Sequence, residues 1–146
     1  MSTFFERKNC RLCESTHIQE AFSLRPSPPA NQFVDSPNVV QEKFPLKLNF
    51  CLSCFHLQLA HVVDPRLLFS NYVYVSGTSP AFVKHFEDYY QNVIETCGLK
   101  NPSFVLEIGS NDGTMLKFFK KAGHQILGVD PAQEISKTAN DQGIET

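Results

Sequence analysis

A chain of 146 residues holds one ordinary domain, or a small domain followed by part of a second one. With 42% hydrophobic and 19% charged residues it has the composition of a globular protein, and its net charge of −2 gives no basic excess for nucleic acid or an anionic membrane. No apolar run reaches the roughly 18 residues of a membrane helix, and the N-terminus lacks the apolar segment of a signal peptide. We therefore expect a cytoplasmic protein, in which five reduced cysteines indicate metal binding or catalysis before disulfides.

The first half of the chain predicts short strands around two cysteine pairs. Residues 1–24 hold the first pair, and the proline-rich residues 25–45 predict an irregular connection with extended pieces. Apolar residues alternate with polar ones in residues 46–50 and again in residues 57–59. This period of two predicts two strands that meet at a cysteine-bearing turn. A short helix is expected from Asp64-Pro65 through Phe69.

The second half predicts a long helix followed by alternating strands and helices. Ser79 suits the N-cap, Pro80 the first helical position and Gly98 the left-handed end of this helix. Its apolar stripe comprises Phe82, Phe86, Tyr89 or Tyr90, Val93 and Cys97. Strands are expected at residues 104–108 and 126–130, and helices at 115–122 and 131–141. This β-α-β-α order favours a parallel, doubly wound sheet.

Two CxxC pairs, Cys10 with Cys13 and Cys51 with Cys54, are the strongest chemical signal. Each turn can direct two thiolates at one metal, and two turns complete the tetrahedral Cys₄ shell of structural zinc. A single CxxC is also typical of a redox pair, which two pairs make a weaker interpretation, and disulfides or unligated core thiols compete with zinc as well. Because four thiolates leave no open position for water or substrate, we expect a structural metal.

Three further residues have simpler interpretations than chemistry. His56 and His61 follow the second cysteine pair and can in principle replace a cysteine ligand, but we expect surface or strand histidines. Cys97 lies on the apolar stripe of the long helix, which favours a small buried side chain over a nucleophile.

The glycine turn (residues 107–113, EIGSNDG) joins the strand at residues 104–108 to the next helix. Gly109 allows a tight turn that a cofactor can approach closely, and Gly113 permits close packing at the helix start. Asp130 ends the following strand, where a carboxylate can accept both hydroxyls of an adenosine ribose. Ligands of doubly wound sheets bind at these carboxyl ends of the strands.

The charge of the glycine turn discriminates between cofactors. A dinucleotide site in the pattern GxGxxG requires glycine at position 111, where this chain has asparagine. Glu107 and Asp112 add negative charge, which repels a pyrophosphate and favours the sulfonium and amino group of S-adenosylmethionine. The competing interpretation is an ordinary strand–turn–helix whose acids face water.

The chain resembles the sugar C-methyltransferase family over nearly its whole length. The resemblance is carried, in order, by CRLC, PPANQF, FPLKLNFCLSCFHLQL, NYVYVSGTS and LEIGSNDGTMLKFFKKAGHQILGVDPA. It implies an N-terminal zinc-binding domain, a methyltransferase domain that uses S-adenosylmethionine, and a further C-terminal domain. Such enzymes methylate a carbon of a nucleotide-linked, usually dTDP-linked, keto-sugar. The resemblance further implies that a base removes a proton beside the ketone and that the resulting enolate attacks the cofactor methyl group.

The resemblance also implies roles for individual residues. Gly109, Asn111, Gly113 and Asp130 match the cofactor-binding motif, and we expect Glu107 of the same turn to join them. A tyrosine in residues 71–79 is implied near the cofactor and the sugar. We expect Tyr74 in this catalytic place and Tyr72 as second choice, against a strand edge with buried tyrosines. Glu14 departs from the family, which often has glycine at this point of the first cysteine turn.

These features predict an α+β zinc-binding N-terminal domain (residues 1–78) and a linking helix (79–100). Residues 101–146 are expected to be the start of an α/β Rossmann-like S-adenosylmethionine methyltransferase domain. Such a sheet needs more strands, and the histidine and glutamate acid–base residues of the family are expected beyond Thr146. We therefore expect a truncated chain, and whether it is an active enzyme stays open.

The expected function is S-adenosylmethionine-dependent C-methylation of a small molecule, a nucleotide-linked keto-sugar, with Zn²⁺ as the structural metal. Neither a nucleic acid nor a membrane is an expected partner, and the oligomeric state stays open. Two further functions compete. One is a catalytically incomplete zinc-binding interaction module, and the second is a dinucleotide-dependent oxidoreductase, against which Asn111 argues.

Overall fold

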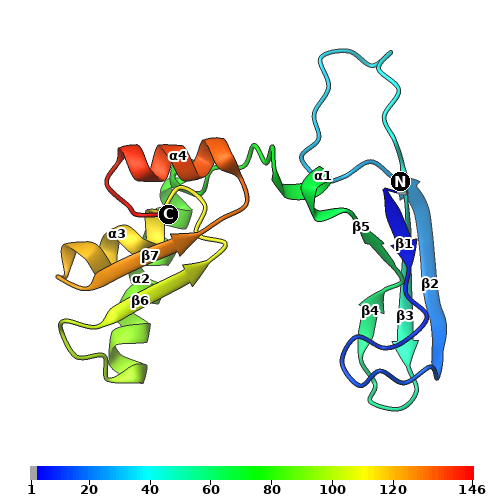
Figure 1. Cartoon of the computed structure of the whole chain (residues 1–146), viewed down its shortest axis with the longest axis horizontal. Coiled ribbons are helices and arrows are strands. Elements are labelled where there is room, and N and C mark those ends of the chain that lie inside the picture. The colour runs from blue at the N-terminus through cyan, green and yellow to red at the C-terminus, as the bar shows by residue number, and fades with distance from the viewer. Residues whose placement is uncertain (1–2) are drawn as a thin grey trace. The chain divides into compact units, whose positions relative to one another are not determined.

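The computed structural model describes residues 3–146, which form two compact units divided between Leu68 and Phe69. The first unit consists mainly of strands, and the second combines helices with a two-stranded sheet (Figure 1). No helix in the described part of the chain is long and apolar enough to cross a bilayer.

The first unit is antiparallel throughout its described sheets. A three-stranded sheet has the order β2 (Ile18–Ser27), β3 (Phe44–Cys51) and β4 (Leu57–Leu59), and β1 (Phe4–Glu6) pairs with β5 (His61–Val63). The short helix α1 (Pro65–Phe69) follows. β3, β4 and α1 confirm the predicted elements, whereas β1, β2 and β5 were not predicted. The sequence pattern did not predict β2, because a bulge between Glu20 and Phe22 interrupts the alternation of apolar and polar residues.

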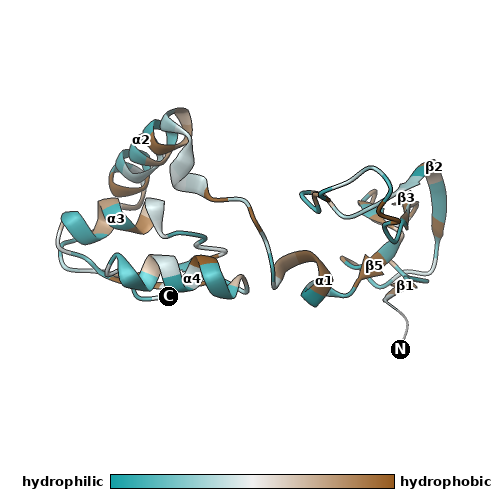
Figure 2. Cartoon of the chain, turned by 90° about the horizontal axis from the view of Figure 1, so that it is seen from above, coloured by the Kyte–Doolittle hydropathy of each residue, from teal (hydrophilic) through white to brown (hydrophobic). Residues whose placement is uncertain are grey.

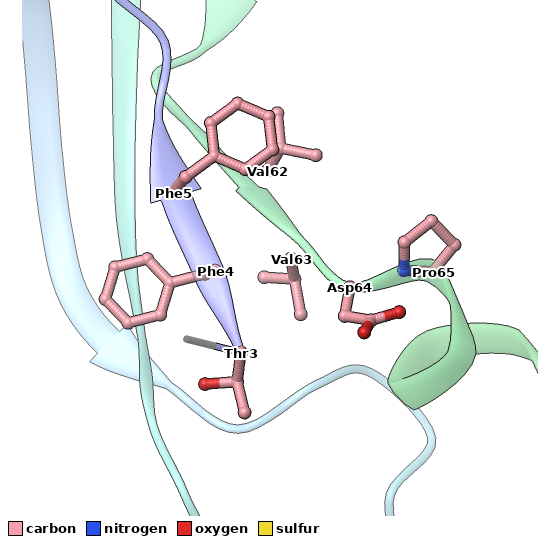
Figure 3. A pocket seen from close by; sticks show the side chains of 7 residues that line it. All are labelled: Thr3, Phe4, Phe5, Val62, Val63, Asp64 and Pro65. Carbon is pink, nitrogen blue, oxygen red and sulfur yellow. The ribbon is translucent and has the colours of Figure 1, made fainter. Parts of the chain in front are cut away.

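A shallow hollow of about 360 Å³ lies beside β1 and β5 (Figure 3). Its lining is mostly apolar, and Asp64 is the one titratable residue among the residues that line it. The guanidinium of Arg66 hydrogen-bonds this carboxylate and lowers the pKa of Asp64 to about 2. Because this acid is already paired and no second titratable residue lines the hollow, we place no chemistry there.

In the second unit a parallel pair of strands is covered on one face by helices. The elements are a 3₁₀ turn η1 (Ser76–Thr78), α2 (Pro80–Cys97), β6 (Phe104–Ile108), α3 (Thr114–Lys121), β7 (Gln125–Val129) and α4 (Gln133–Asp141). β6 and β7 pair in parallel with Val105 opposite Ile126. These two residues pack against a core of Leu116, Ala139 and Ile144. The predicted β-α-β-α order is confirmed.

The opposite face of the β6–β7 sheet is apolar and open to solvent. Phe104, Leu106 and Ile108 of β6 lie on this face together with Val129 of β7, and all four are exposed.

The outer edge of β7 is partly paired by the C-terminal residues. There the backbone N–H of Gly128 donates to the carbonyl of Glu145 at 2.7 Å. Successive residues of a strand direct their backbone groups to opposite edges. The carbonyl of Val129 accepts from the N–H of Gly109 on the β6 side, so the N–H of Gly128 points to the other edge of β7.

Helix α2 begins and ends as its sequence predicts. The Ser79 side chain accepts a hydrogen bond from the N–H of Phe82, and Gly98 closes the helix with φ 56°. The helix packs on α3 through Tyr90, whose ring meets that of Phe119 edge-on at 4.9 Å. It therefore belongs to the second unit, whereas its sequence had suggested a separate linking helix. Figure 2 shows hydrophobic and hydrophilic residues around α2, α3 and α4, as expected of amphipathic helices.

The expectation for Cys97 was wrong, because its side chain is exposed. Along the predicted stripe of α2, Phe86, Tyr90 and Val93 are half-buried, whereas Phe82 and Tyr89 are exposed like Cys97. α2 has no fully buried residue, since it packs mainly against one short helix, α3.

Candidate functional site

The four cysteines of the two CxxC pairs come together in the first unit. Their sulfur atoms all lie within 4.8 Å of one another, with Cys10 Sγ 3.6 Å from Cys54 Sγ and Cys13 Sγ 3.7 Å from Cys51 Sγ. A tetrahedral site with Zn–S bonds of about 2.3 Å separates its sulfurs by about 3.8 Å, so this donor set fits Zn²⁺. The cluster found in residues 3–146 includes neither His56 nor His61, in line with their simpler interpretation.

Both cysteine turns have the same backbone shape, although the residues differ. In the first turn the N–H of Glu14 donates to the carbonyl of Cys10, and in the second the N–H of Phe55 donates to that of Cys51, each at 2.9 Å. Glu14 (φ 60°) and Phe55 (φ 63°) are both in the left-handed region, which side chains other than glycine rarely occupy. Glu14 therefore has a backbone conformation that glycine would adopt without the cost of a Cβ.

At Cys10 and Cys51 the turns supply donors that favour the thiolate, the form that binds metal. Backbone N–H groups of Cys13 and Leu12 hydrogen-bond the sulfur of Cys10 and lower its pKa. The N–H groups of Cys54 and then Ser53 do the same for Cys51 and lower its pKa to about 6. The convergence of four sulfurs, rather than these pKa values, is what indicates a structural Cys₄ site.

Gln58 fastens the first cysteine turn to the sheet. Its side chain is only 3% exposed, accepts from the N–H of Arg11 at 2.7 Å and donates to the carbonyl of Asn9 at 3.0 Å. The two turns also meet directly, because the hydroxyls of Ser15 and Ser53 lie 2.8 Å apart. The sequence pattern did not reveal Gln58, since a polar residue in an alternating strand ordinarily faces water.

A second cluster lies in the second unit at the carboxyl ends of β6 and β7. A hollow of about 470 Å³ there contains several of the predicted site residues. The residues lining it are Phe69, Tyr72, Tyr74, Ser76, Ile108, Gly109, Asn111, Val129, Asp130 and Pro131. The structure thus brings together Tyr72, Tyr74, Gly109, Asn111 and Asp130. Ile108 and Val129 were not predicted to line it, although their place at the strand ends could have revealed them.

Asp130 is oriented by the backbone around it. Its Oδ2 accepts from the N–H of Asn111 and its Oδ1 from the N–H of Ala132, both at 2.8 Å. A carboxylate has about four acceptor positions, so both oxygens retain capacity for a ligand's hydroxyl groups. The acid is thus held at the lip of the hollow while remaining able to bind.

Glu107, the first residue of the glycine turn, does not line the hollow. Its Oε2 is buried without a hydrogen-bond partner. Burial, and after it the charges of Asp112 and Asp130, raises the pKa of Glu107 to about 7. The charges of Asp112 and Asp130 thus act on a third, partly buried acid at this end of the sheet.

The two glycines of the predicted motif have different surroundings. Gly109 (φ 77°) lines the hollow, and a Cβ built on it would meet nothing within 4 Å. Gly113 (φ 72°) lies under Ile144, whose Cγ2 would be 2.5 Å from such a Cβ. Gly113 therefore serves the packing of the core rather than the lining of the hollow.

Aromatic rings form one side of the hollow. Tyr72 lies between Phe69 and Tyr74, with ring centroids 6.3 and 6.4 Å away, and Tyr74 contacts Phe82 at 6.3 Å. Tyr74, the predicted catalytic tyrosine, is 38% exposed, so its ring is only partly covered. Both predicted tyrosines thus lie beside Gly109 and Asp130 rather than in a buried strand.

The fold and the two clusters define a class of protein with a four-cysteine zinc-binding domain and a hollow at the ends of parallel strands. A family model described as "Putative zinc binding domain" (Methyltransf_13) matches residues 10–69, which contain all four cysteines of the cluster. Over 139 residues, or 94% of the chain, the sequence is 32% identical to the C-methyltransferase NovU of Streptomyces niveus. These matches confirm the resemblance to the sugar C-methyltransferase family, and the chain is a relative of NovU that spans about one third of its length.

Proposed function

We propose that this chain provides the zinc-binding and cofactor-binding parts of an S-adenosylmethionine-dependent C-methyltransferase. The proposed substrate is a nucleotide-linked keto-sugar. The observation that carries the proposal is that Gly109, Asp130 and Tyr74 line one hollow at the carboxyl ends of adjacent parallel strands. Doubly wound folds bind nucleotide-like ligands at this place.

The residues around the hollow fit the chemical parts of S-adenosylmethionine. Asp130 is the proposed acceptor for the two ribose hydroxyls, as its backbone donors leave acceptor positions on both oxygens. Gly109 leaves the backbone open to close approach. Ile108 and Val129 offer apolar surface at the ends of β6 and β7 for the adenine ring.

Charge favours this cofactor over a dinucleotide. Burial first, and then repulsion from the charges of Asp112 and Asp130, raises the pKa of Glu107 to about 7. A pyrophosphate would increase this repulsion, whereas a sulfonium and an ammonium group would relieve it. When bound, the cofactor supplies a methyl group on a positively charged sulfur.

Tyr74 is the proposed residue that faces the reacting carbon, with Tyr72 as second choice. Both rings border the hollow beside Ser76 and Asn111, and a phenol there can orient a sugar hydroxyl or carbonyl by hydrogen bonding. The cysteine cluster has no part in this chemistry, because a Cys₄ shell leaves no open position on the metal. Its proposed role is to hold the first unit folded.

Calorimetric titration of the zinc-loaded protein with S-adenosylmethionine and, separately, with NAD tests the cofactor. We expect saturable binding of S-adenosylmethionine and none of NAD at the same concentrations. Binding of NAD alone would contradict the proposal, and an oxidoreductase would replace it. Labelled S-adenosylmethionine with a panel of nucleotide-linked keto-sugars tests the substrate class, for which the matching nucleotides without a sugar are the controls.

A further inference from the structure

The side chain of Asn111 is occupied by the protein itself. Its Oδ1 accepts from the N–H of Ser76 at 2.9 Å, and its Nδ2 donates to the carbonyl of Tyr74 at 2.9 Å. Within a parallel sheet, one residue bonds a carbonyl and the N–H two residues later in the same way. The Asn111 amide thus takes the place of a neighbouring strand for residues 74–76.

Asp112 holds the next residue of the same segment. Its Oδ2 accepts from the N–H of Gly77 at 3.1 Å, while its Oδ1 accepts from the N–H and hydroxyl of Thr114 at the start of α3. The Asp112 side chain is 4% exposed. The contact requires glycine, because a Cβ on Gly77 would lie 2.5 Å from Asp112 Oδ2 and 2.7 Å from Thr114 Oγ1.

We propose that Asn111 and Asp112 are positioning residues that fasten the tyrosine segment (residues 72–77) to the glycine turn. This inference rests on the proposed function, because it gives the turn a second task beside cofactor binding. Three hydrogen bonds join the turn to the tyrosine segment. Two of them link residues that are 35 positions apart in the chain, and the third links residues that are 37 apart. The turn that would carry the cofactor thereby also sets where Tyr72 and Tyr74 stand.

The chemistry of the Asn111 amide separates this role from a direct one at the cofactor. If the Asn111 side chain only bound the cofactor, its removal would leave the structure of residues 74–77 unchanged in the free protein. A positioning side chain must affect them in the free protein, before any ligand is added. Asparagine is also required at position 111, since aspartate cannot donate to the Tyr74 carbonyl.

Amide hydrogen exchange in the free, zinc-loaded protein tests the proposal. In Asn111→Ala we expect the Ser76 and Gly77 amides to exchange at least roughly tenfold faster, the effect of losing about 1.4 kcal/mol of protection. The amides of β7 should keep their rates. Ser76→Ala, which retains the backbone N–H, is the matched control and should leave the Gly77 amide protected.

Fluorotyrosine labelling provides a spectroscopic signature, because the chain has four tyrosines. Asn111→Asp, which is isosteric, and Gly77→Ala should both shift the resonances of Tyr72 and Tyr74 while those of Tyr89 and Tyr90 stay in place. Unchanged Tyr72 and Tyr74 resonances with unchanged exchange at Ser76 and Gly77 would overturn the inference. Equal acceleration throughout the second unit would overturn it too, since that result indicates general destabilisation. Neither measurement uses a cofactor, so a failure of the proposed function is detected separately by calorimetry.

Discussion

The backbone N–H of Asn111 donates to Asp130 Oδ2 at 2.8 Å, and this bond joins the turn after β6 to the end of β7. The two residues are 19 positions apart, yet each fixes the other's place at the lip of the hollow. A change at Asp130 therefore affects both the proposed ligand and the turn that approaches it.

Asp130→Ala should weaken the binding of S-adenosylmethionine by about 1–3 kcal/mol, because hydrogen bonds to a charged acceptor are lost. Isothermal titration of the variant and the parent protein measures the difference. Asp141→Ala removes an exposed carboxylate from the same unit and should bind like the parent. Equal affinities for the Asp130 variant and the parent would rule out the proposed ribose contact.

Replacement of Cys51 by serine should abolish zinc binding and unfold the first unit, because three thiolates cannot complete the shell. The parent protein should contain one zinc per chain by elemental analysis, and the variant none. Amide spectra should show loss of dispersion in residues 3–68 and native positions for β6 and β7. Cys97→Ser changes an exposed cysteine outside the cluster and should keep the metal, so its loss there would refute the assignment.

Glu14→Gly should stabilise the zinc-loaded protein by about 1 kcal/mol. Glu14 has φ 60°, and a Cβ in this region costs roughly 1–2 kcal/mol that glycine does not incur. Chemical denaturation of the first unit measures the gain. Glu14→Ala removes the charged group but keeps the Cβ, so a similar gain in that variant would show that charge, not backbone strain, is responsible.

Gly113→Ala should lower the free energy of unfolding much more than Gly109→Ala does, although the two glycines have nearly equal φ. Both variants incur roughly 1–2 kcal/mol for a left-handed Cβ. The Gly113 variant also forces a methyl group to within 2.5 Å of Ile144 Cγ2, which adds roughly 1–3 kcal/mol. Thermal denaturation compares the two, and equal melting temperatures would show that Ile144 moves aside freely.

The stability of the second unit should fall as pH rises from about 5 to 7. The folded state raises the pKa of Glu107 to about 7 from its usual 4.5, so it binds the proton more tightly than the unfolded chain does. The stabilisation that protonated Glu107 contributes is fully present below its unfolded-state pKa of 4.5 and is lost as pH rises through its folded-state pKa of about 7. In Glu107→Gln the fall in unfolding free energy between pH 5 and pH 7 should be smaller than in the parent by about 1–2 kcal/mol, a figure reduced to allow for solvent screening of this partly buried group.

Denaturant titrations at several pH values measure this dependence. Glu134→Gln changes an exposed acid of α4 and should keep the parent slope. A slope that is unchanged in the Glu107 variant would assign the effect to another group.

Local signals made much of the fold predictable. Ser79, Pro80 and Gly98 fix the limits of α2 through hydrogen bonds and dihedral angles within a few residues. β1 and β5 could not be found in this way, because each has three residues and gains its partner from a distant part of the chain. The burial of α2 was predicted incorrectly at Cys97, since periodicity identifies a stripe but not how far a neighbour covers it.

The candidate site shows the same division. Two CxxC pairs were enough to predict the convergence of four sulfurs, because the chemistry of each turn is local. The strand-end positions of Gly109 and Asp130 likewise predicted a common hollow. The bonds of Asn111 to residues 74 and 76 were beyond prediction, as nothing within the motif EIGSNDG specifies partners 37 and 35 residues earlier.

The Cys₄ cluster also determines where the chain tolerates added length. It joins Cys13 to Cys51, and the part of the intervening chain between β2 and β3 has no regular structure and includes Val40, which is 95% exposed. The entropy of closing such a loop grows only logarithmically, so doubling its length costs about 0.6 kcal/mol. An affinity peptide or a small fluorescent label inserted at residues 38–41 should therefore leave the metal centre intact, and this gives the zinc-binding unit a natural attachment point.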